Sequence, residues 1–291
     1  MGMPDPSPIL LTGASGYVGR HLATALTDAG HRMRGLTRNP DPGRLPDGVE
    51  PVQGDAISGD GLPGALDGVR TAYYLIHSME GGDFAARDRQ AAVNFGEAAA
   101  AAGVQRVLYL GGLGHGDSEH LRSREEVGKL LAERVPTVHV RAAMIIGPGS
   151  ASFEMLRHLV RRLPVMLAPR WVDTPSQPVS IGDVTAALVA LSEREEVPAE
   201  VELGGADVLT YREMMTRAAA LMSRRPVIVG VPVLTPRLSS YWVSLFTPVS
   251  AGLVRPLIEG MGTEMVVEHP PPAGINDDPL GFEAAVKAAL A

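Results

Sequence analysis

The sequence predicts an α/β fold: a doubly wound parallel sheet with helices on both faces, and a smaller, irregular C-terminal region expected to bind or cover a substrate. Three observations predict it. Short apolar segments alternate with alanine-rich helical segments over the first 150 residues, which is typical of parallel strands buried on both faces. A glycine-rich segment at 12–19 separates the first apolar segment from the first helical one. After 147–149 (Gly-Pro-Gly) the alternation stops and prolines become frequent.

The elements of the first half follow from local patterns. Several predicted strands contain short continuous apolar runs, such as 9–11 and 107–110, and the predicted helices are longer and often rich in alanine. Gly30 and Gly103 each follow a helical pattern directly, as C-terminal helix glycines do. In chain order we expect strands at 9–11, 31–37, 49–53, 71–76, 104–110 and 137–146, and helices at 17–29, 84–102 and 118–134.

The second half is less regular. We expect a first domain over 1–150, to which 179–205 returns, and a smaller region over 151–178 and 206–291. The prolines of 207–268 exclude long regular elements there, so we expect this segment to cover a site on the first domain. The expected elements are helices at 152–163, 181–193, 211–222 and 282–290, a strand at 199–203, a proline-punctuated loop at 164–178 and a linker at 269–274.

Composition excludes several classes of protein. The chain has 291 residues, of which 45% are hydrophobic and 20% charged, as in ordinary globular proteins. A net charge of −7 argues against general binding to nucleic acids or anionic membranes. No cysteine is present, which excludes disulfides and thiolate chemistry and fits a reducing compartment, so we expect a cytoplasmic protein. We expect no signal peptide at 1–8 and no integral membrane segment.

The glycine-rich segment predicts a dinucleotide site. Gly13, Gly16 and Gly19 follow the first strand and open a helix, so the backbone N–H groups and the helix N-terminus would face a pyrophosphate. The intervening Ala14, Ser15 and Tyr17 belong to the same predicted site. A tight turn without any ligand is the alternative.

The end of the second strand favours NADP(H), although NAD(H) remains compatible. This position reads Thr37-Arg38-Asn39 and lacks the carboxylate that would bind the 2′-hydroxyl of NAD. The Arg38 guanidinium could bind a 2′-phosphate, unless it is a solvated surface group. Asp55, next to Ala56, could accept a hydrogen bond from the adenine amino group, or could be an ordinary helix-capping or loop aspartate.

These segments, together with Gly147-Pro148-Gly149, resemble the short-chain dehydrogenase/reductase superfamily. The resemblance is closest to its atypical, NmrA-like and epimerase-like branches. It implies a Rossmann-type fold that binds NADP(H) or NAD(H). It also places Leu75, Ile76 and His77 beneath the nicotinamide ribose, and Gly111 where the family usually has its serine.

The usual catalytic residues of that family are changed. No Tyr-x-x-x-Lys pair exists, and lysine occurs only at positions 129 and 287. Compared with the family motif, His120 takes the place of the tyrosine and Arg124 that of the lysine. These two residues share one helix face, and Arg124 should lower the pKa of the imidazole.

Two further histidines follow predicted strands. His77 and His115 stand where this fold places its chemistry, although each of the three histidines could also be structural, His120 as an exposed residue at a helix start. They show no ligand-spaced pair, so we expect no metal site.

The first functional hypothesis is an NADP(H)-dependent oxidoreductase that acts on a small apolar carbonyl or alcohol. The apolar segments 211–222 and 238–261 would line its pocket, or would form ordinary core or the interface of a homodimer. Two alternatives are a non-catalytic NmrA-like redox sensor and an isomerase, dehydratase or cyclase that retains its cofactor. No Gly-x-Ser-x-Gly segment is present, which argues against a hydrolase.

Overall fold

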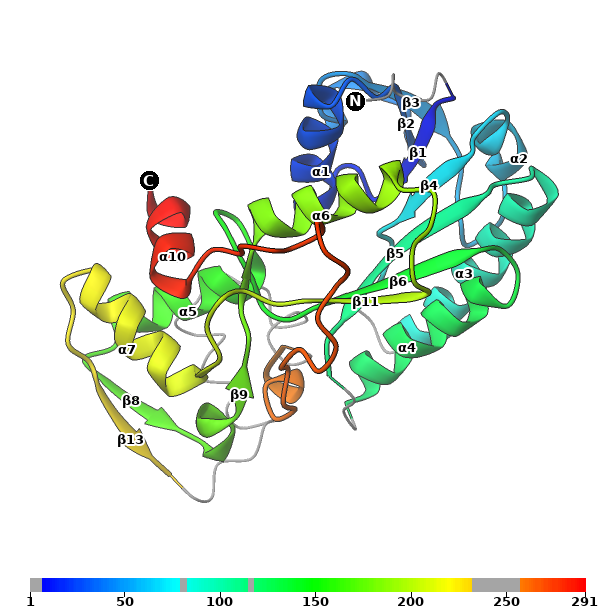
Figure 1. Cartoon of the computed structure of the whole chain (residues 1–291). Helices are drawn as coiled ribbons and strands as arrows, with labels where there is room; N and C mark the ends of the chain where they lie inside the picture. The colour runs from blue at the N-terminus through cyan, green and yellow to red at the C-terminus, as the bar shows by residue number, and fades with distance from the viewer. Residues whose placement is uncertain (1–6, 79–82, 115–117, 232–256) are drawn as a thin grey trace.

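A computed structural model describes residues 7–78, 83–114, 118–231 and 257–291. Its centre is a seven-stranded parallel sheet in the order β11-β6-β5-β4-β1-β2-β3 (Figure 1). The α/β fold class is therefore confirmed. The strands are β1 (Ile9–Thr12), β2 (Met33–Thr37), β3 (Val49–Gln53), β4 (Thr71–Tyr74), β5 (Arg106–Gly112), β6 (Thr137–Ala142) and β11 (Glu200–Leu203).

Helices cover both faces of this sheet because its strands are apolar on both sides. All four residues of β1 are buried, and β5 is buried over five consecutive positions. The helix α1 (Tyr17–Asp28) packs beside α6 (Ile181–Glu193) on one face. The other face carries α2 (Leu62–Leu66), α3 (Phe84–Ala101) and α4 (Glu119–Ala132) (Figure 1).

The sixth predicted strand is interrupted. The chain leaves the main sheet after Ala142, and β7 (Ile145–Ile146) pairs instead with β10 (Val179–Ser180). Leu113 donates its N–H to the carbonyl of Ala142, which closes the end of β6. A continuous apolar sequence could not reveal this change of partner, because both segments are buried.

The prediction of a loop at 164–178 was wrong. This segment contains β8 (Val165–Ala168), the short 3-10 helix η2 (Arg170–Asp173) and β9 (Pro175–Ser176). Its prolines stand at element boundaries: Pro164 precedes β8, Pro169 caps η2 and Pro175 begins β9. A proline at the start of an element needs no N–H donor, so it is compatible with the regular structure that follows.

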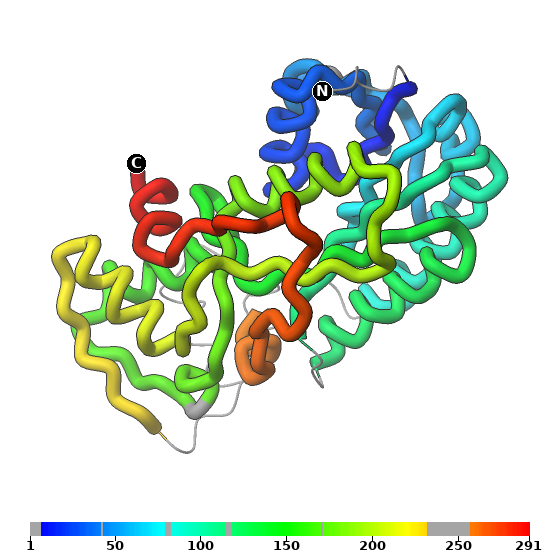
Figure 2. The backbone as a smooth tube through the Cα atoms, viewed as in Figure 1, coloured from blue at the N-terminus to red at the C-terminus, as the bar shows by residue number. Residues whose placement is uncertain are grey.

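A second apolar cluster forms the smaller region. It lies between α5 (Ala151–Arg162), α7 (Tyr211–Leu221) and α10 (Phe282–Leu290), which gather at one end of the chain trace (Figure 2). The sheet of β8 and β13 (Val227–Gly230) and the pair β9 and β12 (Leu209–Thr210) complete it. Within the described ranges, no helix is long and apolar enough to cross a bilayer.

Candidate functional site

A cleft of about 950 Å³ opens at the carboxyl ends of β1, β2 and β3. Crevices at this edge of a parallel sheet are where ligands bind in doubly wound folds. The lining includes seven of the residues predicted from the sequence to hold a dinucleotide. They are Gly13, Ser15, Thr37, Arg38, Asn39, Asp55 and Ala56, and two more of the predicted residues, Ile76 and His77, bring the number in the lining to nine.

The glycine segment has the close packing that a phosphate-binding turn needs. Gly13 has a positive φ of 67°, and a Cβ atom there would lie 3.1 Å from the carbonyl oxygen of Leu75. A Cβ atom on Gly19 would collide with the Gly13 carbonyl. Gly16 is the N-cap of α1 and has no side chain, so no side-chain hydrogen bond caps the first N–H groups of the helix. These features fit a bound pyrophosphate. Ala14 contributes packing instead, because it is 1% exposed and belongs to the core.

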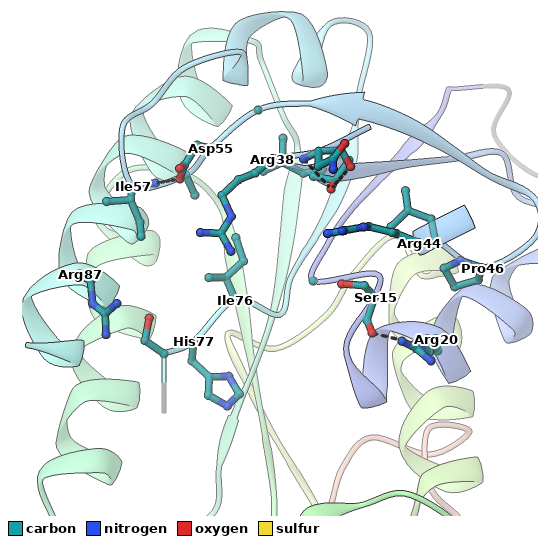
Figure 3. Close-up of a pocket in the computed structure, with 18 of the residues that line it drawn as sticks. Ser15, Arg20, Arg38, Arg44, Pro46, Asp55, Ile57, Ile76, His77 and Arg87 are labelled. Atoms are coloured by element: carbon teal, nitrogen blue, oxygen red, sulfur yellow. Dashed lines mark hydrogen bonds between the residues drawn. The ribbon is translucent and has the colours of Figure 1, made fainter. Parts of the chain in front are cut away.

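Four arginines line the cleft, of which one, Arg38, was predicted from the sequence. Arg38 follows β2, and Arg44 ends the 3-10 helix η1 (Pro42–Arg44). Figure 3 shows both side chains extending into the cleft, with Arg20 on the side of α1 and Arg87 across from them on α3. Arg20 also donates from Nε to the carbonyl of Ser15, 2.8 Å away, which braces the phosphate-binding turn. No carboxylate ends β2, so this part of the cleft is positively charged.

Asp55 has a structural role as well as a place in the cleft. One of its carboxylate oxygens accepts a hydrogen bond of 2.8 Å from the N–H of Ile57. Ala56 is buried, and its carbonyl accepts from the side-chain amide of Asn94, 3.1 Å away. One carboxylate oxygen of Asp55 thus stabilises its own loop, as an ordinary loop aspartate does. The residue nevertheless lines the cleft.

A second, mostly apolar cavity of about 420 Å³ adjoins the first. Gly13 and His77 line both cavities, so the two meet at these residues. Its walls include the predicted site residues Gly16, Tyr17, Gly19, Leu75, Gly111, His120 and Arg124. Met144, Tyr211, Leu257 and Met261 supply much of the remaining lining. Sequence patterns could not assign Met144 to the site, because its position depends on the break between β6 and β7.

Tyr17 packs against the segment that follows β7. Its ring stacks edge-on against His21, with centroids 4.9 Å apart. A Cβ atom on Gly147 would collide with the Tyr17 hydroxyl, which explains the glycine at that position. Burial, with a smaller contribution from Glu154, raises the pKa of Tyr17, so the phenol stays protonated.

His77, His120 and Arg124 come together at the edge of the inner cavity. The rings of His77 and His120 lie 5.9 Å apart, and Phe84 from α3 lies 6.5 Å from His120. Arg124 is fixed on β5: its Nη2 donates to the carbonyl of Leu110, 2.9 Å away, and its own carbonyl accepts from the Tyr109 hydroxyl at 2.8 Å. The alternative of an exposed His120 was wrong, because His120 is only 8% exposed.

Both histidines favour the neutral imidazole. Burial is the main cause that lowers the pKa of His120 to about 4, and the positive charge of Arg124 adds to it. The same two causes, with His120 as a third, hold the pKa of His77 well below its usual range. The expected effect of Arg124 on His120 is therefore found, but it is second to burial. At neutral pH the cluster carries a single positive charge, on Arg124.

The structure explains why glycine replaces the usual serine at position 111, near the end of β5. A Cβ atom on Gly111 would collide with Nε2 of His139, which lies between β5 and α4. The His139 ring also packs against Tyr109, with centroids 4.9 Å apart, and a Cβ atom on Gly128 of α4 would lie 2.9 Å from its Nδ1. His139 thus fills the space that a side chain at position 111 would need, a contact that spans 28 positions and has no local signature.

Replacing Gly111 with serine is expected to destabilise the fold by about 1–3 kcal/mol, because it overpacks a filled space. The matched Gly112→Ser variant should be milder, since a Cβ atom there meets only the end of the flexible Leu121 side chain at 3.1 Å. Urea unfolding measures both. The His139→Ala change should relieve the Gly111→Ser penalty in the double variant, and equal penalties with and without it would contradict the explanation.

Acid is expected to destabilise the protein through its buried histidines. Burial, then Arg141, lowers the pKa of His139 to about 4, as for His120. Their stabilisation is complete above the unfolded pKa of about 6.5 and is lost as the pH falls towards 4, at up to about 1.4 kcal/mol per pH unit for each group. Between pH 7 and 5, the free energy of unfolding measured in urea should fall less steeply for His139→Gln than for the control His269→Gln, whose histidine side chain is 84% exposed. Identical slopes would contradict this assignment.

His115 and residues 238–256 of the predicted apolar lining lie outside the described residues. From the remainder of that lining, Leu257, Gly260 and Met261 do reach the inner cavity, as does Tyr211 from 211–222.

Comparisons with known proteins match this geometry. Residues 13–144 match the family model described as NAD(P)H-binding. A ceramide reductase of Caulobacter vibrioides is 31% identical over 243 residues, which are 77% of this chain and 73% of the relative. A (4-alkanoyl-5-oxo-2,5-dihydrofuran-3-yl)methyl phosphate reductase of Streptomyces griseus is 30% identical over 231 residues, 74% of each chain. An NADPH-dependent quinone oxidoreductase of Escherichia coli, solved with NADPH, superposes with a TM-score of 0.74 at 19% identity, over 97% of this chain and 100% of that one.

Proposed function

Because the chain belongs to the NAD(P)H-binding, atypical short-chain dehydrogenase/reductase family, we propose that it is an NADP(H)-dependent oxidoreductase that interconverts a carbonyl and an alcohol on a small apolar molecule. The junction of the two cavities carries this proposal. The dinucleotide cleft meets a mostly apolar pocket at Gly13 and His77, and His120 and Arg124 stand in the wall of that pocket.

The choice of NADP(H) rests on charge. The guanidinium groups of Arg38 and Arg44 enter the part of the cleft that follows β2, and β2 does not end in the carboxylate that would repel a 2′-phosphate (Figure 3). Planar guanidinium groups bind phosphate oxygens through paired, charge-assisted hydrogen bonds. When bound, the nicotinamide supplies or accepts the hydride.

His120 is the proposed residue for the proton. In the oxidising direction its neutral imidazole accepts the proton of the substrate hydroxyl, and in the reducing direction the imidazolium returns it to the carbonyl oxygen. Arg124 positions His120 from the next helical turn and disfavours its cationic form. His77 extends the wall towards the dinucleotide cleft and can hold the substrate oxygen by a hydrogen bond.

The proposed substrate is apolar because the inner pocket is. Its lining includes the side chains of Met144, Leu257 and Met261, which suit an irregular apolar molecule. Both curated relatives are named as reductases, and one is named for ceramide. We assign substrate binding to the smaller region, 151–178 and 206–291, and dinucleotide binding to 1–150 with 179–205. The absence of cysteine supports a reducing, cytoplasmic setting.

Cofactor turnover tests this proposal. The purified chain is incubated with NADPH and a panel of ketones and aldehydes of increasing apolar chain length, while the nicotinamide absorbance is followed. We expect steady NADPH consumption that is faster with the longer apolar members. Tight binding of both NADPH and NADP⁺ without turnover of any carbonyl would favour the redox sensor. Product formed without net loss of NADPH would favour a cofactor-retaining isomerase, dehydratase or cyclase.

A further inference from the structure

The two-stranded sheet of β8 and β13 exposes four aliphatic side chains on one face. Val165 and Leu167 on β8 are 53% and 52% exposed, and Val227 and Val229 on β13 are 57% and 44% exposed. The strands are parallel, with Val227 opposite Val165 and Val229 opposite Leu167. Because alternate residues of a strand share a face, the four side chains form one compact patch, here called the aliphatic patch.

The other face of the same sheet is fixed to the core. Met166 and Ala168 on β8 are 2% and 5% exposed and belong to the apolar cluster of the smaller region. Met144 and Met261, which line the inner cavity, belong to the same cluster. The aliphatic patch therefore lies on the outer side of a packed element whose inner side supports the substrate pocket. Figure 1 shows this sheet at the end of the molecule away from the main sheet.

Exposed arginines flank the patch at one end. Arg161 and Arg162 end α5 just before β8, and Arg224 and Arg225 precede β13. Since β8 and β13 run parallel, the two arginine pairs lie at the same end of the sheet. All four residues are exposed, and no acidic residue occurs in 158–172 or 214–231. The local charge is thus positive although the whole chain carries −7.

We propose that the aliphatic patch docks on the surface of a membrane that contains anionic phospholipids. The four aliphatic side chains would enter the boundary between headgroups and acyl chains, and the exposed Arg161, Arg224 and Arg225 would bind the lipid phosphates. The net charge of −7 argues against a general attraction of the chain to anionic surfaces. Salt screens charges that lie more than a Debye length from the membrane, so the arginines beside the aliphatic patch would dominate its binding.

A lipid surface fits this patch better than a protein partner does. Four aliphatic side chains are few for a stable protein interface, which typically involves about 20–30 residues a side. A second copy of the chain placed face to face would bring the same patch, whose flanking segments carry no negative charge to pair with the arginines. An anionic membrane supplies opposite charge, and each apolar or basic residue contributes to membrane binding by itself.

Flotation of the full chain with lipid vesicles tests the proposal. We expect the protein to float with phosphatidylcholine vesicles that contain phosphatidylglycerol, to do so much less with phosphatidylcholine alone, and to be released by salt. The Arg161→Glu/Arg224→Glu variant should bind the anionic vesicles at least about tenfold more weakly. The Val165→Ser/Leu167→Ser variant should also lose binding.

Matched controls change equally exposed residues elsewhere. Val208→Ser removes an aliphatic side chain that is 51% exposed and lies on neither strand, and Arg32→Glu reverses an exposed charge before β2. Both controls should float like the wild type. NADPH turnover of a water-soluble carbonyl is measured in every variant and shows whether the fold and the reductase site are intact. Loss of vesicle binding can then be distinguished from loss of the proposed reaction.

Three outcomes would overturn the proposal. The first is a wild-type protein that floats with neither kind of vesicle. The second is binding by the arginine variant that equals that of Arg32→Glu. The third is a wild-type dimer, seen by analytical ultracentrifugation, that the Val165→Ser/Leu167→Ser change dissociates while vesicle binding is unchanged. That last result would make the aliphatic patch an interface between two copies of the chain.

Discussion

Replacing His120 with phenylalanine is expected to lower kcat by about 10²–10⁴-fold, the usual cost of losing a general acid or base. The affinity for NADPH should stay within about threefold, because His120 lines the inner cavity and not the outer cleft. Phenylalanine keeps the ring that packs near His77 and Phe84. Stopped-flow or steady-state turnover gives kcat, and fluorescence titration gives the Kd for NADPH.

The pH dependence separates a chemical role of His120 from a structural one. With a pKa of about 4, the imidazole is neutral over most of the working range, so the rate of reduction should rise as the pH falls towards that value. Oxidation, which needs the neutral base, should be nearly constant above about pH 5. The matched control is His158→Phe on α5, which lines neither cavity. If His120→Phe keeps the wild-type kcat and pH profile, His120 only fills space.

Replacing Arg38 with alanine is expected to weaken NADPH binding by at least about tenfold and to leave NADH binding nearly unchanged. A charge-assisted hydrogen bond of this kind contributes about 1.5–3 kcal/mol. NADH lacks the 2′-phosphate, so it does not make the contact. Isothermal titration of both dinucleotides measures the difference.

The second arginine sharpens this test. Arg44 enters the same part of the cleft from η1, so Arg38→Ala/Arg44→Ala should remove most of the preference for NADPH. Arg32→Ala, which changes an exposed arginine outside both cavities, should bind both dinucleotides like the wild type. Equal losses of NADPH and NADH affinity in the Arg38 variant would contradict a phosphate contact.

Local patterns were sufficient for the core of the fold. The central strands β1 and β5 contain continuous buried apolar runs, and the glycine spacing at 13–19 indicated the first strand, turn and helix. The segment 164–178 departs from the predicted loop because proline does not always interrupt regular structure. Pro164, Pro169 and Pro175 instead stand at the starts of elements, where they are tolerated.

The site was predicted well where it is local and poorly where it depends on tertiary packing. All residues of 13–19 except Ala14, and all of 37–39, line the cavities because the chain itself brings them to the ends of β1 and β2. Arg44 was missed because a loop arginine has no motif to mark it. The burial of His120 depends on Phe84 and His77 from other elements, which no pattern in 118–134 encodes.

Gly13 and His77 form a common wall between the outer cleft and the inner pocket. A molecule that occupies one cavity therefore contacts the boundary of the other. If the first molecule changes the affinity for the second by some factor, the second changes the affinity for the first by the same factor, because such coupling is reciprocal at equilibrium. Occupancy of the two cavities is thus linked by the fold itself, and the order in which they fill decides how much of each affinity is seen in an experiment.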